Sequence, residues 1–181
     1  MPLYTVGHGT LEREAFAALL VQAGVDLVVD VRRYPGSRRH PWMNRAQLQR
    51  WLPEGGVGYR WEEALGGRRR GVPDSPHVAI RNAAFRAYAD HMHSDDWRGV
   101  LEEVLDEARH RTVAVMCSES VWWRCHRRLI ADAATLLHDL KASHLMHDGR
   151  LDAHRVTKGA RVAGDRIVYD VGGGQPTLLE R

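Results

Sequence analysis

Apolar residues along this chain occur in two patterns, short continuous runs and helical spacing. Residues 3–6 form a short apolar run that ends at a Gly-His-Gly tripeptide. Over residues 11–23 apolar positions recur every three or four residues, which predicts a helix, and Gly24 follows as a suitable C-terminal cap. Residues 26–31 are again almost continuously apolar, as a parallel strand buried on both faces should be. This β-α-β beginning is the strongest indication of fold in the sequence.

The same patterns continue to residue 169. Further strands are predicted at residues 58–61, 112–116 and 142–147, and further helices at residues 46–52, 82–93, 95–110 and 121–139. Loops rich in Arg, Gly and Pro are predicted at residues 32–45 and 65–76. Residues 162–169 predict a terminal hairpin, and the glycine run 172–174 a loose tail.

Alternating strands and helices predict an α/β fold. We expect one open, mostly parallel sheet with helices on both faces, a Rossmann-like three-layer arrangement, and a small C-terminal hairpin. A chain of 181 residues suits one domain with a full hydrophobic core. We assign that domain to residues 1–160 and treat residues 161–181 as a hairpin and tail of the same unit.

Composition narrows the class of protein. With 44% apolar and 27% charged residues, the chain is typical of a globular protein. Its N-terminus lacks the basic and apolar segments of a signal peptide, and no run approaches the roughly 18 apolar residues that span a bilayer. We therefore expect a cytoplasmic protein without a membrane partner. Its two cysteines do not make a disulfide framework and would stay reduced there.

The charge balance is mildly basic, with a formal net charge of +3. Only Lys141 and Lys158 are lysine, so 24 of the 26 basic residues are arginine, a bias typical of a GC-rich genome. The positions of the arginines are therefore more informative than their number. Basic loops at residues 32–45 and 66–71, together with Tyr34, Tyr59 and Trp61, leave open a surface for nucleotides or single strands.

Residues 113–128 carry the densest candidate chemistry. An apolar run ends at Cys117, and the helix predicted from residue 121 would place its positive dipole near this thiol. Arginines fall in the first turns of that helix, and two serines could cap it: Arg124, Arg127, Arg128, Ser118 and Ser120. Thiol phosphatases and rhodanese-type sulfurtransferases share this layout. Six residues separate Cys117 from Arg124, however, one more than in tyrosine phosphatases, and Glu119 would repel phosphate. An inert cysteine that ends a core strand is the alternative.

Ligands in open α/β sheets bind beyond the carboxyl ends of the strands. Three predicted strand ends should converge there, and they carry Gly7 and His8, Asp30 and Arg32, and Cys117 and Glu119. A carboxylate near the end of an apolar strand is costly unless it is paired. Asp30 and Arg32 point to the same side, so they form a structural ion pair, line the crevice, or do both.

These arguments define two sets of candidate residues. The catalytic candidates are Cys117 as the nucleophile or redox thiol, and Glu119 and His126 for proton transfer. The ligand-binding candidates are Gly7, His8, Asp30, Arg32 and Arg127. Arg127 could also pair with Asp30 or Glu119. Cys125 is assigned to the core, because at helical spacing it shares a face with Leu129.

A structural metal site is a further alternative. The side chains of Cys117, Cys125, His126 and His8 are suitable zinc ligands, but their spacing matches no compact zinc knuckle. His144 and His147 are three apart in a predicted strand, which would put them on opposite faces. We assign no metal ligand, and the cofactor stays open.

Several motifs in combination resemble one known family. They are Thr-Val-Gly-His-Gly-Thr at 5–10, Val-Asp-Val-Arg-Arg-Tyr-Pro-Gly-Ser at 29–37, Leu-Gly-Gly at 65–67, Met-Cys-Ser-Glu at 116–119, Cys-His-Arg at 125–127 and Ser-His-Leu at 143–145. Together they resemble domain-of-unknown-function family 488 over residues 3–150. The family's usual Cys-Ala-Glu appears here as Cys117-Ser118-Glu119. The resemblance implies a single α/β domain with the motif residues at the strand ends, and it supplies no reaction.

The sequence therefore predicts a protein that binds an anionic ligand, bearing phosphate or a nucleotide, at the strand ends, with thiol chemistry at Cys117. If it is an enzyme, it is a cysteine-dependent one of unassigned reaction. A nucleic-acid or nucleotide-binding module without catalysis is the first alternative, and a structural metal-binding domain is the second. The oligomeric state stays open.

Overall fold

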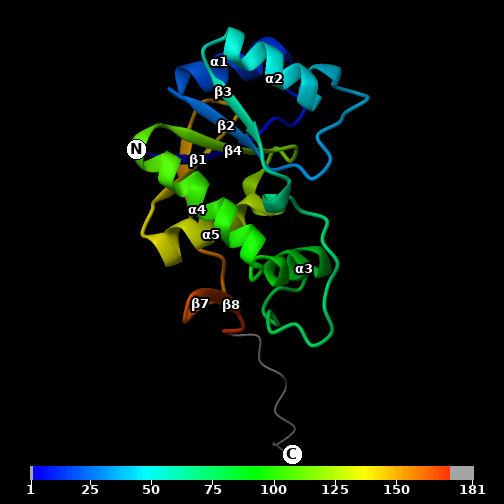
Figure 1. Cartoon of the computed structure of the whole chain (residues 1–181), viewed down its shortest axis with the longest axis vertical. Coiled ribbons are helices and arrows are strands. Elements are labelled where there is room, and N and C mark those ends of the chain that lie inside the picture. Colours follow the sequence, from blue (N-terminus) through cyan, green and yellow to red (C-terminus); the bar gives the residue numbers. More distant parts are fainter. Residues whose placement is uncertain (1, 172–181) are drawn as a thin grey trace, which may run out of the picture.

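The fold was analysed in a computed structural model that describes residues 2–171 (Figure 1). A six-stranded sheet has the order β3-β2-β4-β1-β5-β6, in which β6 alone runs antiparallel to its neighbour. The strands are β1 (Leu3–Gly7), β2 (Leu27–Asp30), β3 (Gly58–Trp61), β4 (Val113–Cys117), β5 (Ala142–Leu145) and β6 (Leu151–Ala153). The predicted mostly parallel α/β sheet is confirmed.

Helices cover both faces of this sheet. They are α1 (Arg13–Gln22), α2 (Arg45–Glu54), α3 (Ala83–His91), α4 (Asp95–His110) and α5 (Arg127–His138), with short 3-10 turns η1 (Pro41–Met43), η2 (Glu63–Leu65) and η3 (Trp122–Arg124). In Figure 1, α1 and α2 lie above the sheet, and α4 and α5 lie below it. The chain thus forms the three layers that the sequence predicts.

The two hydrophobic cores follow from strand alternation. In β4, Val113 and Val115 face the core beneath α4 and α5, and Ala114 and Met116 face the core beneath α1 and α2. All five residues of β4 are buried, because helices cover both sides of this central strand. Cys117 continues the Val113 face, so its thiol lies on the α5 side of the sheet.

The predicted hairpin is also confirmed. Strands β7 (Ala160–Ala163) and β8 (Arg166–Tyr169) pair antiparallel and lie below α5 in Figure 1. Ile167 and Tyr169 are buried in the same core as α4 and α5, and the Tyr169 hydroxyl donates to Asp132 of α5 at 2.9 Å. The predicted glycine tail at 172–174 lies outside the described residues.

The helix predicted at residues 121–139 is wrong in its first turns. Only η3 forms at Trp122–Arg124, and α5 begins at Arg127 with His126 as its N-cap. The expected serine caps are therefore not made, since no side chain caps α5. The Arg127 guanidinium binds the carbonyl oxygens of Glu119 and Ser120, which holds residues 118–126 as a loop against the end of β1.

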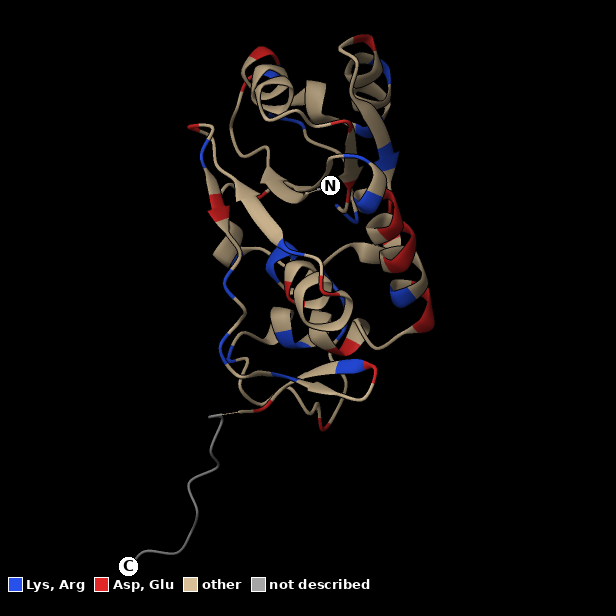
Figure 2. Cartoon of the chain, turned by 90° about the vertical axis from the view of Figure 1, so that its left-hand side faces the viewer, with Lys and Arg blue, Asp and Glu red and all other residues tan. Residues whose placement is uncertain are grey.

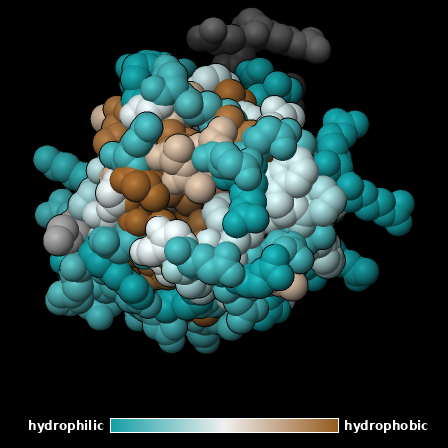
Figure 3. Space-filling model, turned by 90° about the horizontal axis from the view of Figure 1, so that it is seen from above, coloured by the Kyte–Doolittle hydropathy of each residue, from teal (hydrophilic) through white to brown (hydrophobic). Residues whose placement is uncertain are grey.

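The outer face of the α1–α2 layer carries an apolar groove of about 300 Å³ that includes Ala17, Val21, Leu52 and Val57. Figure 3 views the molecule from this end and shows apolar surface framed by hydrophilic side chains. Over residues 2–171, no helix has the length and apolar character needed to cross a membrane.

Candidate functional site

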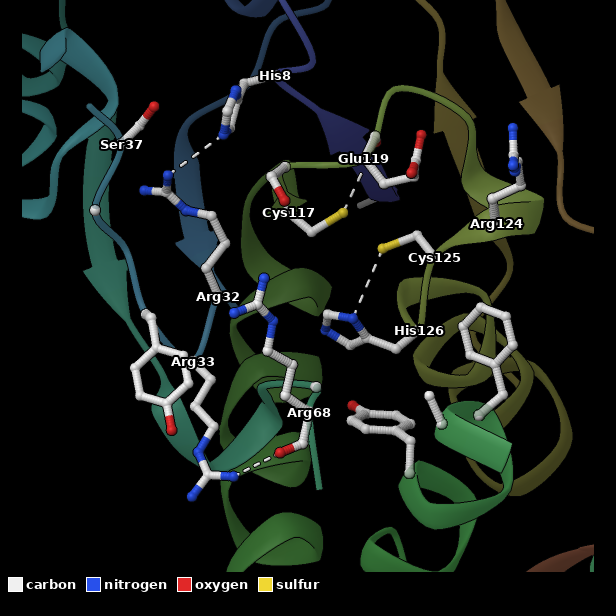
Figure 4. A pocket seen from close by; sticks show the side chains of 17 residues that line it. His8, Arg32, Arg33, Ser37, Arg68, Cys117, Glu119, Arg124, Cys125 and His126 are labelled. Atoms are coloured by element: carbon white, nitrogen blue, oxygen red, sulfur yellow. Dashed lines mark hydrogen bonds between the residues drawn. The ribbon is translucent and has the colours of Figure 1, made fainter. Parts of the chain in front are cut away.

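A pocket of about 320 Å³ opens beyond the carboxyl ends of β1, β2 and β4, which are neighbours in the sheet. Of the residues predicted from the sequence, it brings together His8, Arg32, Cys117, Glu119 and His126 (Figure 4). Gly7, Asp30 and Arg127 do not line it. The three strand ends thus converge as expected. Gly7, Asp30 and Arg127 lie behind the pocket surface and support the residues that line it.

Asp30 and Arg32 form a fully buried ion pair. Arg32 donates through Nε at 2.8 Å and Nη2 at 2.6 Å to the Asp30 carboxylate, which also accepts from the Tyr59 hydroxyl at 2.8 Å. The carboxylate is 0% exposed and its oxygens are occupied, so it orients Arg32 rather than meeting a ligand. Burial, and then the charge and hydrogen bond of Asp30, raise the pKa of Tyr59, so this hydroxyl stays a donor.

His8 is held neutral beside Arg32. Its Nδ1–H donates to Gly9 O at 3.0 Å, which leaves Nε2 to accept from Arg32 Nη1 at 3.3 Å. Burial and the neighbouring guanidinium lower the pKa of His8 to about 4. At neutral pH His8 therefore contributes no positive charge to the pocket.

Gly7 permits a close approach of two chain segments. A Cβ at this position would lie 1.8 Å from the Glu119 carbonyl oxygen and 2.9 Å from Arg127 Nη1. Only the absence of a side chain lets the loop after β4 pack on the end of β1. The glycine shapes the site from behind and does not approach the ligand space.

Arg127 is buried, with 1% of its side chain exposed. Its Nη1 donates to Cys117 Sγ at 2.7 Å and to Glu119 O at 2.5 Å, and its Nη2 donates to Ser120 O at 3.1 Å. None of these contacts is the ion pair with Asp30 or the Glu119 carboxylate that the sequence suggests. The guanidinium instead places a positive charge beneath the thiols.

The two cysteines lie close together at the floor of the pocket, where Figure 4 shows both sulfurs between His126 and Glu119. Burial raises the pKa of the Cys117 thiol, and its hydrogen bond to Cys125 adds to that rise. Burial also acts against ionisation of Cys125. There it is outweighed by the hydrogen bond from Cys117, the charge of Arg127 and the backbone N–H of Arg127, which lower the pKa to about 7.

The start of α5 explains why the negative charge of a thiolate is more favourable on Cys125 than on Cys117. This cysteine lies two residues before the first residue of the helix, where free N–H groups and the helix dipole favour an anion. Cys117, ten residues before that start, does not lie at the helix end as the sequence indicated. The directions of the two shifts therefore make Cys125 the more acidic of the two thiols.

His126 completes the floor. Its ring packs against Tyr88 with centroids 4.8 Å apart, and its Nδ1 lies 3.7 Å from Cys125 Sγ. Burial and nearby Arg127 act to lower the pKa of His126, so the ring is neutral at pH 7. The neighbouring Gly67 packs closely on this ring, and a Cβ there would make a tight contact of 3.0 Å with Nδ1.

Arginines from the two long loops supply positive charge to the walls. In Figure 4 the Arg68 side chain extends into the middle of the pocket, between Arg32 and His126. Arg33 donates to the Arg68 carbonyl at 2.7 Å and pairs with Glu63, which fixes the loop in a left-handed turn at Arg68, with φ of 58°. Within residues 2–171 no ion pair involves Arg68 or Arg124, so both guanidinium groups are available to a ligand.

The described residues contain no cluster of three or more His, Cys, Asp or Glu side chains arranged to hold a metal ion. His144 instead takes part in a buried hydrogen-bonded chain. Its Nδ1 pairs with the Thr5 hydroxyl at 2.6 Å, its Nε2 with His154 at 3.0 Å, and His154 with Asp132 at 2.9 Å. His147 lies apart from this chain and contacts Gly7 O at 2.7 Å.

Sequence reasoning missed two residues of the site. Cys125 is buried in the core with Leu129 as predicted, although the segment before Arg127 is not helical, and the sequence does not indicate that this cysteine also lines the pocket. The sequence places Arg68 only in a basic loop, although the Gly66-Gly67 pair before it indicates a tight turn against other chain segments.

Comparison with known proteins gives one match. The family model described as "Domain of unknown function DUF488" matches residues 12–134. Searches of curated proteins and of solved structures find nothing that matches. The matched range contains Arg32, Arg68, both cysteines and Arg127, whereas His8 precedes it.

Proposed function

The chain belongs to the family of the domain of unknown function DUF488, and from its pocket we propose that the protein binds an anionic group, of a phosphate- or nucleotide-bearing ligand, and carries out thiol chemistry on that ligand. The observation that carries this proposal is the arrangement of charge. Two arginines without ion pairs among the described residues, Arg68 and Arg124, stand in the walls over a thiol pair on the floor.

In this proposal each residue has a distinct task. Cys125 is the thiolate that attacks an electrophilic atom of the ligand and displaces a leaving group, which departs with the electron pair of the broken bond. Cys117, the nucleophile that the sequence suggests, is its hydrogen-bond donor and the second thiol of the pair. Arg68 and Arg124, with Arg32 behind them, bind the anionic group, and the charge of Arg127, whose Nη1 donates to Cys117, stabilises the Cys125 thiolate. Glu119 and His126 are the candidates for proton transfer.

The first test measures the thiols directly. We expect iodoacetamide to alkylate Cys125 with a midpoint near pH 7, as mass spectrometry of the labelled peptide would show. Cys117→Ser retains a hydroxyl donor and should keep that midpoint within about one unit. In Cys125→Ser, Cys117 should react only at or above roughly pH 8.5, the free-thiol value. Faster labelling of Cys117 in the wild type would overturn this assignment.

The second test measures whether an anion binds in the pocket. Inorganic phosphate or adenosine monophosphate should slow alkylation of Cys125, because the ligand covers the thiol. Arg68→Gln or Arg124→Gln should weaken this protection about tenfold, the cost of one charge-assisted hydrogen bond. Arg70→Gln is the matched control, since Arg70 lies in the same loop outside the pocket. Absence of protection by both anions would remove the proposal.

Binding without catalysis is the second candidate function. Residues of both basic loops, including Arg33, Tyr34, Ser37 and Arg68, line the pocket, which favours a nucleotide held between them. Cys117→Ser and Cys125→Ser would then bind the nucleotide as the wild type does, and no product would form. We also propose the cytoplasm as the location, since both cysteines are free thiols and a reducing compartment keeps them so.

A further inference from the structure

A second concave surface adjoins the pocket. A groove of about 580 Å³ lies between the start of α3, the loop that carries η3 and the segment after β6. Phe85 lines both this groove and the pocket, and Arg124, which lines the pocket, directly follows Trp123 of the groove. The two concave surfaces are therefore neighbours along one face.

The groove is strongly cationic. Its charged lining residues are Arg81, Arg128, Arg155 and Lys158, and no Asp or Glu lines it. None of the four cations forms an ion pair with another described residue. Figure 2 shows basic and acidic residues interspersed over the ribbon, so a surface without any acid is a local feature and not a result of overall charge.

Aromatic faces accompany these cations. Trp123 is 48% exposed and meets Trp122 edge to face at 5.6 Å, while Trp122 stacks on the buried His144 ring at 4.1 Å. The Arg128 guanidinium lies 4.6 Å from the centroid of Phe85. An indole fixed by packing on one side and exposed on the other is a stacking platform for a planar group.

Resting on the proposed function, we propose that the anionic ligand of the pocket is part of a single-stranded nucleic acid, whose adjoining nucleotides lie in this groove. Unpaired cations along the groove match a phosphodiester backbone, and Trp123 offers its face to a base. An acidic peptide would use the cations but leave the indole without a partner. A duplex would keep its bases stacked inside and could not reach it.

The test is fluorescence anisotropy with a fluorescein-labelled dodecathymidylate. If all four cations contact phosphates, affinity should fall about 50-fold between roughly 50 and 200 mM NaCl. Lys158→Gln should reduce the salt slope by about 0.7, the contribution of one phosphate contact. Arg50→Gln is the matched control, because this exposed arginine lies on α2, which covers the opposite face of the sheet from α5, and it should leave both quantities unchanged.

Trp123 tests the stacking. Trp123→Ala should weaken binding about tenfold, and Trp123→Phe should restore most of it, since any aromatic face can stack on a base. The side chain is half exposed, so neither change should prevent folding. Equal binding of a fluorescein-labelled oligoglutamate, or affinity that none of the groove variants alters, would overturn the inference.

Protection of Cys125 from alkylation tests whether a ligand that binds in the groove also reaches the pocket. The dodecathymidylate should slow alkylation of Cys125, and Trp123→Ala should weaken that protection. If phosphate protects the thiol but the oligonucleotide neither binds nor protects, the groove inference fails and the anion-binding pocket stands. If the oligonucleotide binds through the groove but neither it nor phosphate protects Cys125, the proposed function of the pocket fails, and with it the assignment of its ligand.

Discussion

The two sulfurs at the floor of the pocket differ in what surrounds them. Burial raises the pKa of both thiols, but the hydrogen bond between them raises the pKa of Cys117 and lowers that of Cys125. Cys125 precedes the first turn of α5 and receives the Arg127 backbone N–H. These surroundings make Cys125 the more acidic thiol of the pair.

The guanidinium of Arg127 acts on both thiols, because its charge lowers the pKa of Cys117 as well as that of Cys125. Arg127→Met would leave the carbonyls of Glu119 and Ser120 without a donor, at a cost of about 2–3 kcal/mol in the free energy of unfolding. It would also raise the alkylation midpoint of Cys125 by about one pH unit, because the positive charge is lost. Urea unfolding and pH-dependent labelling measure the two effects.

Arg124→Met is the control for this change. Arg124 is exposed and has no ion pair among residues 2–171, so its loss should alter the free energy of unfolding by less than about 0.5 kcal/mol. A midpoint for Cys125 that stays at its wild-type value in Arg127→Met would show that the guanidinium does not stabilise the thiolate.

The elements that build the site meet where β1 and β4 end side by side. His8 N donates to Cys117 O at 3.0 Å and Gly9 N to Ser118 O at 3.1 Å, so parallel pairing continues beyond the strands. The loop after β4 then folds back over Gly7. This close approach brings the carbonyls of the loop to Arg127 and leaves Cys125 beside Cys117.

Two glycines in regular elements should respond in opposite ways to alanine. Gly7→Ala would drive a Cβ into the Glu119 carbonyl, and we expect it to lower the free energy of unfolding by about 3 kcal/mol. Gly99→Ala, in the middle of α4 with nothing within 4 Å of its Cβ, should raise it by about 1 kcal/mol. Urea unfolding of both variants checks the pair, and a neutral Gly7→Ala would mean that the loop is free to move away.

The molecule as a whole buries several histidines in the neutral form. Burial, the largest cause in each case, lowers the pKa of His8 and His77 to about 4 and that of His144 to about 3. The residues belong to different parts of the fold, namely the pocket, the core beside the hairpin, and β5. Their effects should therefore add.

This predicts a loss of stability in mild acid. Below pH 6.5 the unfolded chain binds protons at these histidines and the folded chain does not, so the free energy of unfolding falls as pH falls from about 6.5 toward 4. Each histidine should contribute about 2 kcal/mol of this loss by pH 5. Urea unfolding at pH 7 and pH 5 measures the difference.

Single substitutions test which histidines cause this dependence of the free energy of unfolding on pH. His144→Gln, or His77→Gln if the first variant folds poorly, should reduce the difference between pH 7 and pH 5 by about 2 kcal/mol. His110→Gln, at an exposed position at the end of α4, should leave it unchanged. An equal pH dependence in all of these variants would rule out the buried histidines as its origin.

The sequence by itself determined the layers, the strand ends and the Asp30–Arg32 pair. Apolar runs and helical spacing report burial of near neighbours, and two residues that are two apart at a strand end lie on the same side whatever else the chain does. The motifs that resemble the family point to the same strand ends, and the family model that matches residues 12–134 agrees with that resemblance.

Only the tertiary structure decided which thiol ionises and which arginines face the ligand. The start of α5 depends on contacts between Arg127, the loop before it and the end of β1, which are far apart in the sequence. Arg68 enters the pocket because Arg33 holds its carbonyl across 35 positions of chain. Charge at a buried atom depends on everything packed around it, and local periodicity contains no information about those neighbours.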